Sequence, residues 1–437
     1  MKHFLLPFFL LPVLAAAQTP SKAKINALAD QLEPKVVAWR RDFHQHPELG
    51  NREFKTAEKI AAHLKSLGLD VRTGVAHTGV VALLKGGKPG PVVALRADID
   101  ALPVTERVAV AFASTVKTTY NDQNVGVMHA CGHDTHVAIL MGAAEILTAM
   151  KGELKGTVKF IFQPAEEGAP NGEEGGAKLM VKEGVLENPK VDAIFGLHIN
   201  AQTEVGQIRY KPGGAMASSD EFTVRVKGRQ SHGAYPWLGV DPIVAAAQII
   251  TGLQTIVSRQ LPLTNEAAVV TVGAIHGGVR NNIIPEEVEM IGTIRALDTT
   301  MQRAMHEKIR RTATLIAESS GARADVTIKT GYPVTFNDPD LTNAMLATLQ
   351  GVAGKENVVL QKAVTGAEDF SFFQQKVPGF FFFLGGAPRG KQPEQTAPHH
   401  TPDFFIDDSG LELGVKALCH LTVDYLNGAA NAQPAGK

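Results

Sequence analysis

The chain has 437 residues, of which 44% are hydrophobic and 20% are charged, a composition typical of a globular protein with material for two domains. The formal net charge is −1, which argues against the basic surface of a protein that binds nucleic acid or an anionic membrane. Beyond the N-terminal residues, no segment is apolar over enough positions to span a bilayer.

The first residues have the pattern of a secretory signal peptide. Lys2 and His3 precede an apolar run over residues 4–14, and the small residues 15–17 form a cleavage site. The apolar run is too short to cross a bilayer as a permanent helix, and the alternative is an uncleaved N-terminal anchor. We therefore expect residues 1–17 to be a signal peptide and the mature protein to be exported, either to the periplasm or to the medium.

Helices and short apolar strands alternate in the first half of the chain. Helical periodicity covers residues 22–43 and 56–67, and Gly68 ends the second helix. A further helix is predicted over residues 134–150. Apolar runs of strand length lie at residues 80–84, 92–95, 158–162 and 191–197. Strands that are apolar on both faces predict a doubly wound, mostly parallel α/β sheet, which binds ligands at the carboxyl ends of its strands.

The pattern changes after Gly213. Strand signals of alternating polarity and two long helical patterns predict an inserted α+β domain over residues 214–328. The α/β domain is therefore expected to be discontinuous, with residues 20–213 and 329–428. The strand signals of the insertion are 221–226, 267–275 and 287–294, and its helical patterns are 242–258 and 300–319. The last predicted segments are a strand over 380–384, a helix over 411–426 and a loose tail over 429–437.

Metal-binding residue types crowd into one short stretch, M-H-A-C-G-H-D-T-H at residues 128–136. Nitrogen and sulfur donors at this density suit Zn²⁺ or a similar divalent ion, and the alternative is a polar turn. The possible donors are His129, Cys131, His133, Asp134 and His136.

The two cysteines of the chain have different surroundings. Cys419 lies in the apolar-periodic helix near the C-terminus and is expected to be a small buried hydrophobic residue. Cys131 lies two residues from His133, so we expect its thiolate to bind metal. The alternative, in an exported protein, is a disulfide between the two cysteines.

Other candidate residues follow predicted strands. Glu166 and Glu167 are adjacent on an irregular segment, so one carboxylate can bind metal while the other takes a proton from the water that the metal activates. His198 also follows an apolar strand, and His399 and His400 lie in a proline-rich loop. Taken alone, each has an ordinary alternative, namely a solvated carboxylate pair, a structural histidine and a surface histidine pair.

Seven segments occur in one order along the chain. They are R-A-D-I-D-A-L-P-V, M-H-A-C-G-H-D-T-H, Q-P-A-E-E-G, G-L-H, G-R-Q-S-H-G-A-Y-P, G-G-V-R-N-N-I-I-P and H-H-T-P-D-F. Together they resemble the metal-dependent aminoacylase/carboxypeptidase family, in the branch of hippurate hydrolases and indole-3-acetyl-amino-acid hydrolases. The resemblance covers residues 26–426 and implies a catalytic domain of the zinc-exopeptidase type with an inserted lid or dimerisation domain.

The resemblance implies a dinuclear metal site in which Glu166 is the general base and later the acid. His400 is preferred to His399 as a ligand because the family's ligand directly precedes a small residue and a proline, here Thr401 and Pro402. The residues that would hold the two divalent ions (Zn, Mn, Co or Ni) are Cys131, His133, Glu167, His198 and His400.

Three acidic residues would support these ligands. By the resemblance, Asp98 and Asp100 orient them, and the alternative for Asp98 is an ordinary loop or helix cap. Asp134 begins the helix over 134–150 and would cap or support it. His129 and His136 are expected to serve packing, hydrogen bonding or the pocket wall.

The inserted domain would contribute substrate-binding residues. By the resemblance, His232 polarises the scissile carbonyl, often across a dimer interface, Asn282 binds substrate, and Arg280 meets a substrate carboxylate. The alternatives are a turn histidine, a loop cap and a solvated charge. The loop over residues 169–174 is longer than in the commoner family pattern, which leaves the preferred substrate open.

Together the residues and the resemblance predict an exported, metal-dependent amidohydrolase, expected to be a homodimer, that cleaves N-acyl or N-aroyl amino acids. One alternative is a metallo-carboxypeptidase or dipeptidase acting on short peptides. The other is a non-catalytic protein that binds metal or amino acids; such a protein would lack the base, whereas Glu166 is present. No nucleic-acid partner is expected, and no membrane partner after signal cleavage.

Overall fold

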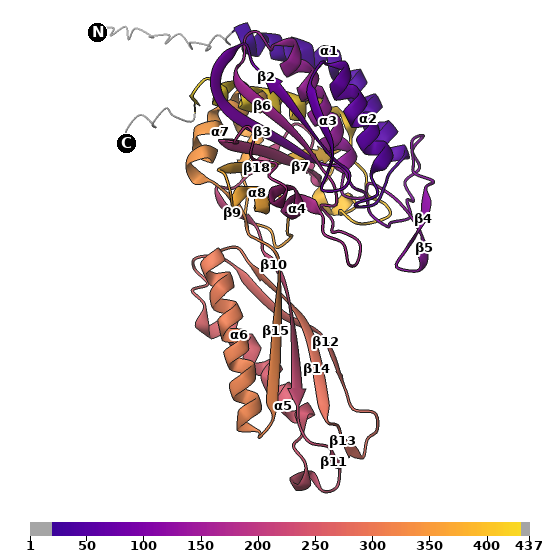
Figure 1. Cartoon of the computed structure of the whole chain (residues 1–437), viewed down its shortest axis with the longest axis vertical. Helices are drawn as coiled ribbons and strands as arrows, with labels where there is room; N and C mark the ends of the chain where they lie inside the picture. Colours follow the sequence, from indigo (N-terminus) through magenta and orange to yellow (C-terminus); the bar gives the residue numbers. More distant parts are fainter. Residues whose placement is uncertain (1–19, 430–437) are drawn as a thin grey trace, which may run out of the picture.

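The computed structural model describes residues 20–429, which form two domains (Figure 1). The larger domain contains an eight-stranded sheet in the order β1-β2-β6-β3-β7-β18-β8-β17. The central strands β6, β3, β7 and β18 are parallel, and antiparallel pairs flank them on both sides. The predicted mostly parallel α/β sheet is therefore confirmed. The strands are β1 (Asp70–Val75), β2 (Gly79–Lys85), β3 (Lys88–Asp98), β6 (Lys155–Gln163), β7 (Ala193–Glu204), β8 (Ile208–Tyr210), β17 (Val358–Leu360) and β18 (Gly379–Ala387).

Helices cover both faces of this sheet because apolar side chains alternate between two cores. Phe380 and Phe382 of β18 lie in one core, and Phe381 and Phe383 lie in the other. The first core includes side chains of α1 (Pro20–Gln45), α2 (Phe54–Ser66), α3 (His133–Ala149), α7 (Pro339–Ala353) and α9 (Leu411–Leu426). The second includes side chains of α4 (Gly176–Lys182) and α8 (Ser371–Gln374). Burial on both faces explains the continuous apolar runs of these strands.

The smaller domain has four antiparallel strands in the order β12-β14-β10-β15, with two helices packed on one face of the sheet. The helices begin where an aspartate accepts hydrogen bonds from backbone N–H groups of the first turn, Asp241 in one case and Asp298 in the other. The elements are β10 (Ser219–Lys227), α5 (Pro242–Gln260), β12 (Ala268–Gly277), β14 (Glu287–Ala296), α6 (Thr299–Ser319) and β15 (Arg323–Tyr332).

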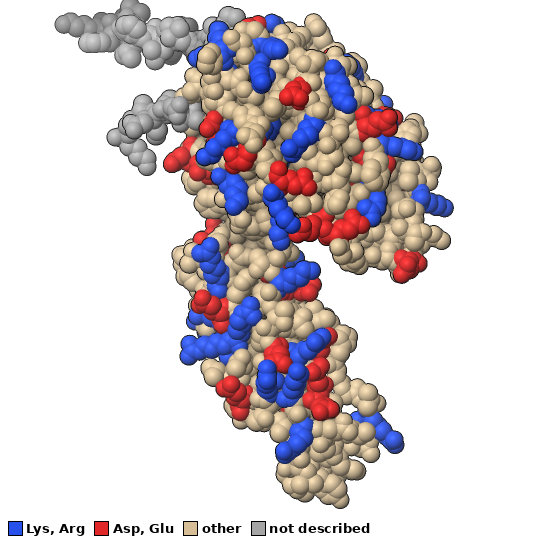
Figure 2. All heavy atoms as spheres, in the orientation of Figure 1, with Lys and Arg blue, Asp and Glu red and all other residues tan. Residues whose placement is uncertain are grey.

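Short elements complete the described residues. The strand pairs are β4 (Lys117–Tyr120) with β5 (Gln123–Gly126), β9 (Gly213–Met216) with β16 (Thr335–Asn337), and β11 (Ser231–His232) with β13 (Ile283–Ile284). The 3₁₀ helices are η1 (Pro236–Leu238), η2 (Lys355–Asn357), η3 (Pro393–Gln395) and η4 (Asp408–Gly410). Within residues 20–429, the helices are too short or too polar to cross a membrane. Charges of both signs are interspersed on the face shown in Figure 2, in keeping with a net charge of −1.

The structure differs from the sequence-based expectations in several elements and boundaries. Strands β1 and β15 were not predicted, because neither contains the continuous apolar run of a strand that is buried on both faces. β15 continues to Tyr332, so the smaller sheet extends beyond residue 328. The strand predicted to end at Leu197 continues to Glu204, because β18 pairs with it through Asn200, and His198 therefore lies inside β7. The predicted signal peptide lies outside the described residues, as does the tail beyond residue 429.

A buried arginine compensates a group of buried carboxylates beneath the ends of the parallel strands. The guanidinium of Arg96 lies 2.7 Å from Asp98, 2.9 Å from Glu368 and 3.0 Å from Asp369. Its Nε also donates a hydrogen bond to Gln163, at 2.8 Å. All four charged side chains are almost fully buried, and the single guanidinium contacts all three carboxylates, so its positive charge compensates the group.

We expect Arg96→Met to lower the free energy of unfolding by about 3–5 kcal/mol, because it removes the cation that contacts all three buried acidic side chains. Urea denaturation followed by circular dichroism would measure the loss. Arg107→Met is the matched control, since Arg107 pairs with Asp403 on the surface and its removal should change stability little. Equal effects of the two substitutions would contradict the compensating role of Arg96.

Candidate metal centre

The predicted metal ligands lie together, although they come from four segments of the chain. Sγ of Cys131 is 3.3 Å from Nε2 of His198 and 3.3 Å from Nε2 of His400. Oε1 of Glu167 is 3.0 Å from Nε2 of His400 and 3.9 Å from Nε2 of His133. The segments are the start of α3 (Cys131, His133), the loop after β6 (Glu167), β7 (His198) and the loop after β18 (His400).

The turn that presents Cys131 and His133 requires glycine at position 132. The φ angle of Gly132 is 92°, in the left-handed region that favours glycine. A Cβ atom there would also lie 2.3 Å from Cγ2 of Ile199 in β7. Gly132 therefore allows the start of α3 to approach β7, where Cys131 meets His198.

Hydrogen bonds identify which ring nitrogens are free to bind a cation. Nδ1 of His133 lies 2.9 Å from the backbone oxygen of Asp100, and Nδ1 of His198 lies 2.6 Å from the backbone oxygen of Ile199. Because a carbonyl oxygen only accepts, Nδ1 of each ring donates, and in the neutral ring Nε2 carries the lone pair. Both Nε2 atoms face the other donors of the cluster, as a ligand must.

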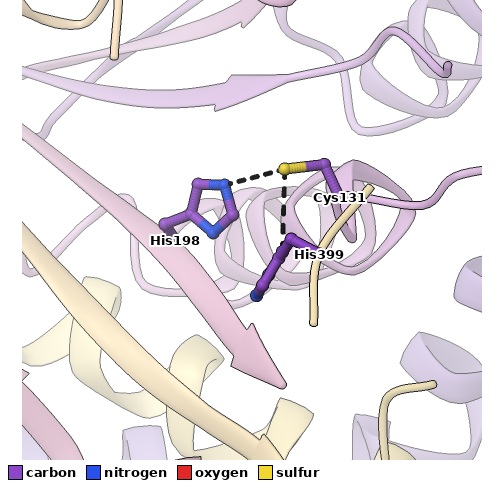
Figure 3. A group of neighbouring side chains, drawn as sticks. All are labelled: Cys131, His198 and His399. Carbon is purple, nitrogen blue, oxygen red and sulfur yellow. Dashed lines mark hydrogen bonds between the residues drawn. The ribbon is translucent and has the colours of Figure 1, made fainter. Parts of the chain in front are cut away.

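Two neighbouring histidines have the opposite arrangement. Backbone N–H groups of β7 donate to Nε2 of His136 and to Nε2 of His399, so the proton of each ring is on Nδ1. The Nδ1 proton of His136 points to the carboxylate of Asp98. The Nδ1 proton of His399 points to Sγ of Cys131 (Figure 3). Burial lowers the pKa of His399 to about 3, which keeps the ring neutral. The hydrogen bonding thus favours His400 over His399 as the metal ligand.

Two buried polar atoms of the cluster accept no hydrogen bond of good geometry. They are Nε2 of His133 and Oε1 of Glu167. Leaving such an atom unpaired costs about 1–3 kcal/mol. A divalent cation held by the thiolate, imidazoles and carboxylate would satisfy both atoms, and this donor set suits Zn²⁺ or another transition-metal ion. The residues therefore fit a divalent metal.

Ionisation in the cluster reflects an excess of negative charge. Burial and the nearby carboxylates of Glu167 and Glu166 raise the pKa of the Cys131 thiol well above its usual value. Burial lowers the pKa of His133, but the carboxylates of Asp98 and Asp100 outweigh burial and raise that pKa to about 10. A bound cation would displace both protons, since it favours the thiolate and the neutral imidazole.

Glu166 lies beside these ligands with a carboxyl group that has few partners. The residue is 5% exposed, and its Oε1 accepts one long hydrogen bond, 3.4 Å, from the backbone N–H of Asp369. Burial, together with Glu368 and Glu167, raises the pKa of Glu166 well above its usual range. Such a group can accept a proton and return it, which is the requirement for a general base that later acts as an acid.

The backbone that carries Glu166 and Glu167 is held from several sides. Ala165 has a φ of 49°, and its N–H donates to Oε1 of Glu53 at 2.8 Å. The N–H of Glu167 donates to Oδ2 of Asp100 at 3.0 Å. The hydroxyl of Tyr332 donates to the carbonyl of Glu166 at 2.6 Å. The loop therefore presents its two carboxylates from a fixed backbone.

The three predicted supporting carboxylates have different partners. Asp100 accepts hydrogen bonds from Nδ1 of His133 and from the backbone N–H of Glu167. Asp98 accepts one from Nδ1 of His136. The carboxylate of Asp134 instead lies 2.8 Å from both His44 and Arg40 of α1. Asp134 therefore anchors the start of α3 to α1, and the N-cap position of α3 is occupied by Gly132.

The structure does not bring the inserted-domain residues to this cluster within one chain. His232 and its neighbours belong to the β11–β13 pair, which lies at the end of the smaller domain that is remote from the large sheet (Figure 1). His232 is exposed, and its Nδ1 accepts a hydrogen bond from the N–H of Ala234. Arg280 and Asn282 are exposed on the segment leading into β13.

Several residues around the cluster were missed from the sequence. Glu368 and Asp369 carried a usable signal, because an acidic pair directly before the apolar run F-S-F-F is unusual for a solvated surface. Tyr332 carried no such signal, since only the folded chain places it beside Glu166.

A pocket of about 470 Å³ adjoins Glu167. Apolar side chains such as Leu49, Leu102 and Val116 form part of its wall. The cationic side chain of Arg52 forms two hydrogen-bonded contacts with Glu173, which neutralise its charge. Glu173 belongs to the long loop over residues 169–174. The pocket is lined by parts of the segments 47–52, 100–103, 116–121 and 167–170, together with Val127.

The chain matches the model of peptidase family M20/M25/M40 over residues 94–424. It is 39% identical over 406 residues to thermostable carboxypeptidase 2 of Saccharolobus solfataricus, covering 92% of this chain and 98% of that protein. It is 38% identical over 415 residues to IAA-amino acid hydrolase ILR1-like 4 of Arabidopsis thaliana, covering 94% of this chain and 90% of that protein.

A solved structure agrees with these relatives. A Bacillus subtilis protein, described as a dinuclear metal-binding peptidase of the M20 family, superposes with a TM-score of 0.77 and 37% identity, covering 91% of this chain and 99% of that one. The resemblance predicted from the motifs is thus confirmed, as is the enzymatic character. The chain belongs to peptidase family M20/M25/M40 and is a metal-dependent amidohydrolase.

Proposed function

We propose that this protein hydrolyses the amide bond of N-acyl or N-aroyl amino acids. The observation that carries the proposal is the buried carboxyl of Glu166 beside a converged thiol, imidazole and carboxylate set with unsatisfied ligand atoms. The relative named as an IAA-amino acid hydrolase supports an acyl amino acid as substrate. A second candidate is a carboxypeptidase of short peptides, which the carboxypeptidase relative supports.

Two divalent ions would be held by the five predicted ligands, with Cys131 central among them. When bound, the ions supply a Lewis acid that polarises the amide carbonyl and acidifies water. Glu166 takes a proton from the attacking water and returns it to the departing amine nitrogen. Asp100 keeps His133 in the tautomer that binds metal, and it holds the backbone N–H of Glu167 at the same time.

The acyl group is proposed to occupy the pocket beside Glu167. The carboxylate of an amino acid lies only two bonds from the scissile nitrogen, so in this pocket it would meet the acidic side chains of Asp100 and Glu48. An uncharged acyl group avoids that repulsion and buries its surface against Leu102 and Val116. The amino-acid part would therefore face away from the pocket.

We further propose export and a homodimer. The residue pattern over positions 2–17 supports export. A dimer would place His232, Asn282 and Arg280 of one protomer near the donor cluster of its partner, where His232 would polarise the scissile carbonyl. The exposure of these side chains, remote from the large sheet of their own chain, supports such an arrangement.

Metal removal should abolish hydrolysis, because the proposed ligands have no other means of acidifying water. N-acyl amino acid hydrolysis is measured after dialysis against a chelator, and again after addition of Mn²⁺, Co²⁺ or Zn²⁺. We expect loss and then recovery of activity, with a matching fall and rise in melting temperature as the buried donors lose and regain the cation. Full activity in protein that elemental analysis shows to hold no metal would contradict the mechanism.

Glu166→Gln should lower kcat by about 10²–10⁴-fold, since the amide cannot take the proton. Metal content should stay unchanged, because Glu166 is not among the proposed ligands. Glu174→Gln is the matched control, as Glu174 pairs with Lys182 on the surface. A variant at position 166 that keeps its turnover would exclude Glu166 as the base.

A bulky side chain in the pocket should discriminate between acyl groups. Thr118 of the exposed β4–β5 hairpin lines the pocket, so Thr118→Trp should lower kcat/KM for an N-benzoyl amino acid by about tenfold while sparing the N-acetyl analogue. Gln123→Trp, on the same hairpin and outside the pocket lining, is the control. Equal losses for both substrates would place the acyl group elsewhere.

A further inference from the structure

The last residue of the smaller sheet reaches into the larger domain. Tyr332 ends β15, and its hydroxyl donates to the backbone carbonyl of Glu166 at 2.6 Å. The ring packs edge-to-face on Phe372, with centroids 6.1 Å apart. Burial raises the pKa of Tyr332, so the phenol stays protonated and remains a donor. Tyr332 thus contacts the loop of the proposed base without being one of the proposed ligands.

A bulge in β15 directs Tyr332 toward this loop. Ser219 of β10 pairs with Tyr332, whereas Asp220 pairs with Thr330, which leaves Gly331 as an extra residue. A Cβ at Gly331 would lie 2.1 Å from the backbone oxygen of Ser219, so only glycine fits. The N–H of Gly331 donates to Oδ1 of Asp220 at 3.2 Å, which satisfies the backbone at the bulge.

The same aspartate ties the bulge to a helix of the smaller domain. Asp220 is 2% exposed, and its Oδ2 lies 2.8 Å from Nε2 of Gln302 and 2.7 Å from Nε2 of His306. Both partners belong to α6. The bulge that precedes Tyr332 is therefore tied to α6 through Asp220.

The Tyr332 contact acts on a single peptide unit. The carbonyl of Glu166 and the N–H of Glu167 are the two ends of one planar group. Tyr332 donates to the carbonyl end, and Oδ2 of Asp100 accepts from the N–H end. With both ends held, the plane cannot rotate, so the two adjacent side chains keep their separate directions.

We propose that Tyr332 is a positioning residue that clamps the peptide plane between Glu166 and Glu167 and so fixes the direction of the Glu166 carboxylate. The effect on turnover rests on the proposed function, in which Glu166 moves the proton. The effect on the backbone does not, because the clamp exists whatever the substrate. The two effects can be measured separately.

Tyr332→Phe removes only the hydroxyl and should lower kcat about tenfold. The Glu166 carboxylate would then be in the productive orientation for a smaller fraction of the time in which substrate is bound. KM, metal content and melting temperature should match the wild type. Tyr425→Phe is the matched control, since Tyr425 packs on Phe195 from α9 and has no contact with the loop. Unchanged kcat, a rise in KM alone, or a parallel loss of metal would each overturn the proposal.

Hydrogen–deuterium exchange supplies the second readout and requires no substrate. The amide of Glu167 should exchange faster in Tyr332→Phe than in the wild type or in Tyr425→Phe, because the peptide plane is then held at one end only. Unchanged exchange would overturn the clamp. If the wild type hydrolyses neither N-acyl amino acids nor dipeptides, the proposed function fails, and the exchange result alone decides whether the clamp exists.

Discussion

The structure depends on the burial of many ionisable groups at one edge of a sheet with few cations to compensate them. Arg96 supplies the positive charge beneath this edge, where it contacts Asp98, Glu368 and Asp369. An isolated buried carboxylate costs several kcal/mol, so this edge is stable only with paired charges or a bound cation. The same requirement explains why the thiol of Cys131 and the ring of His133 have strongly raised pKa values in the protein alone.

Backbone groups in and beside the sheet also determine which ring nitrogen of each histidine in the cluster carries the proton. Carbonyl groups take the Nδ1 proton of His133 and His198, which leaves Nε2 free, whereas N–H groups of β7 occupy Nε2 of His136 and His399. Four neighbouring imidazoles therefore differ in which ring nitrogen carries the proton. The assignment comes from backbone groups that strand pairing leaves free. The pairing of β7 with β3 ends at Gly196, so the N–H groups of Ile199 and Ala201 can donate to the rings, while β18 holds this part of β7 on its other side.

Much of the larger domain could be predicted because its strands are buried on both faces and read as apolar runs. β1 and β15 could not, since their side chains are mostly accessible and show no such run. The Cys131–His133 spacing identified two of the five proposed ligands, because both belong to one turn. The motif resemblance added Glu167, His198 and His400 as proposed ligands. The fold brings all three close to Cys131 or to one another.

By itself, the sequence determined the fold class, the donor-rich turn before α3 and the family. These depend on local periodicity and on the order of motifs, which can be recognised without the folded structure. Tertiary structure alone decided which ring nitrogens the backbone occupies, the partners of Asp134 and the contact of Tyr332 with Glu166. These depend on hydrogen bonds between residues far apart in sequence, and ring nitrogens or carbonyls acquire their partners only when the strands are assembled.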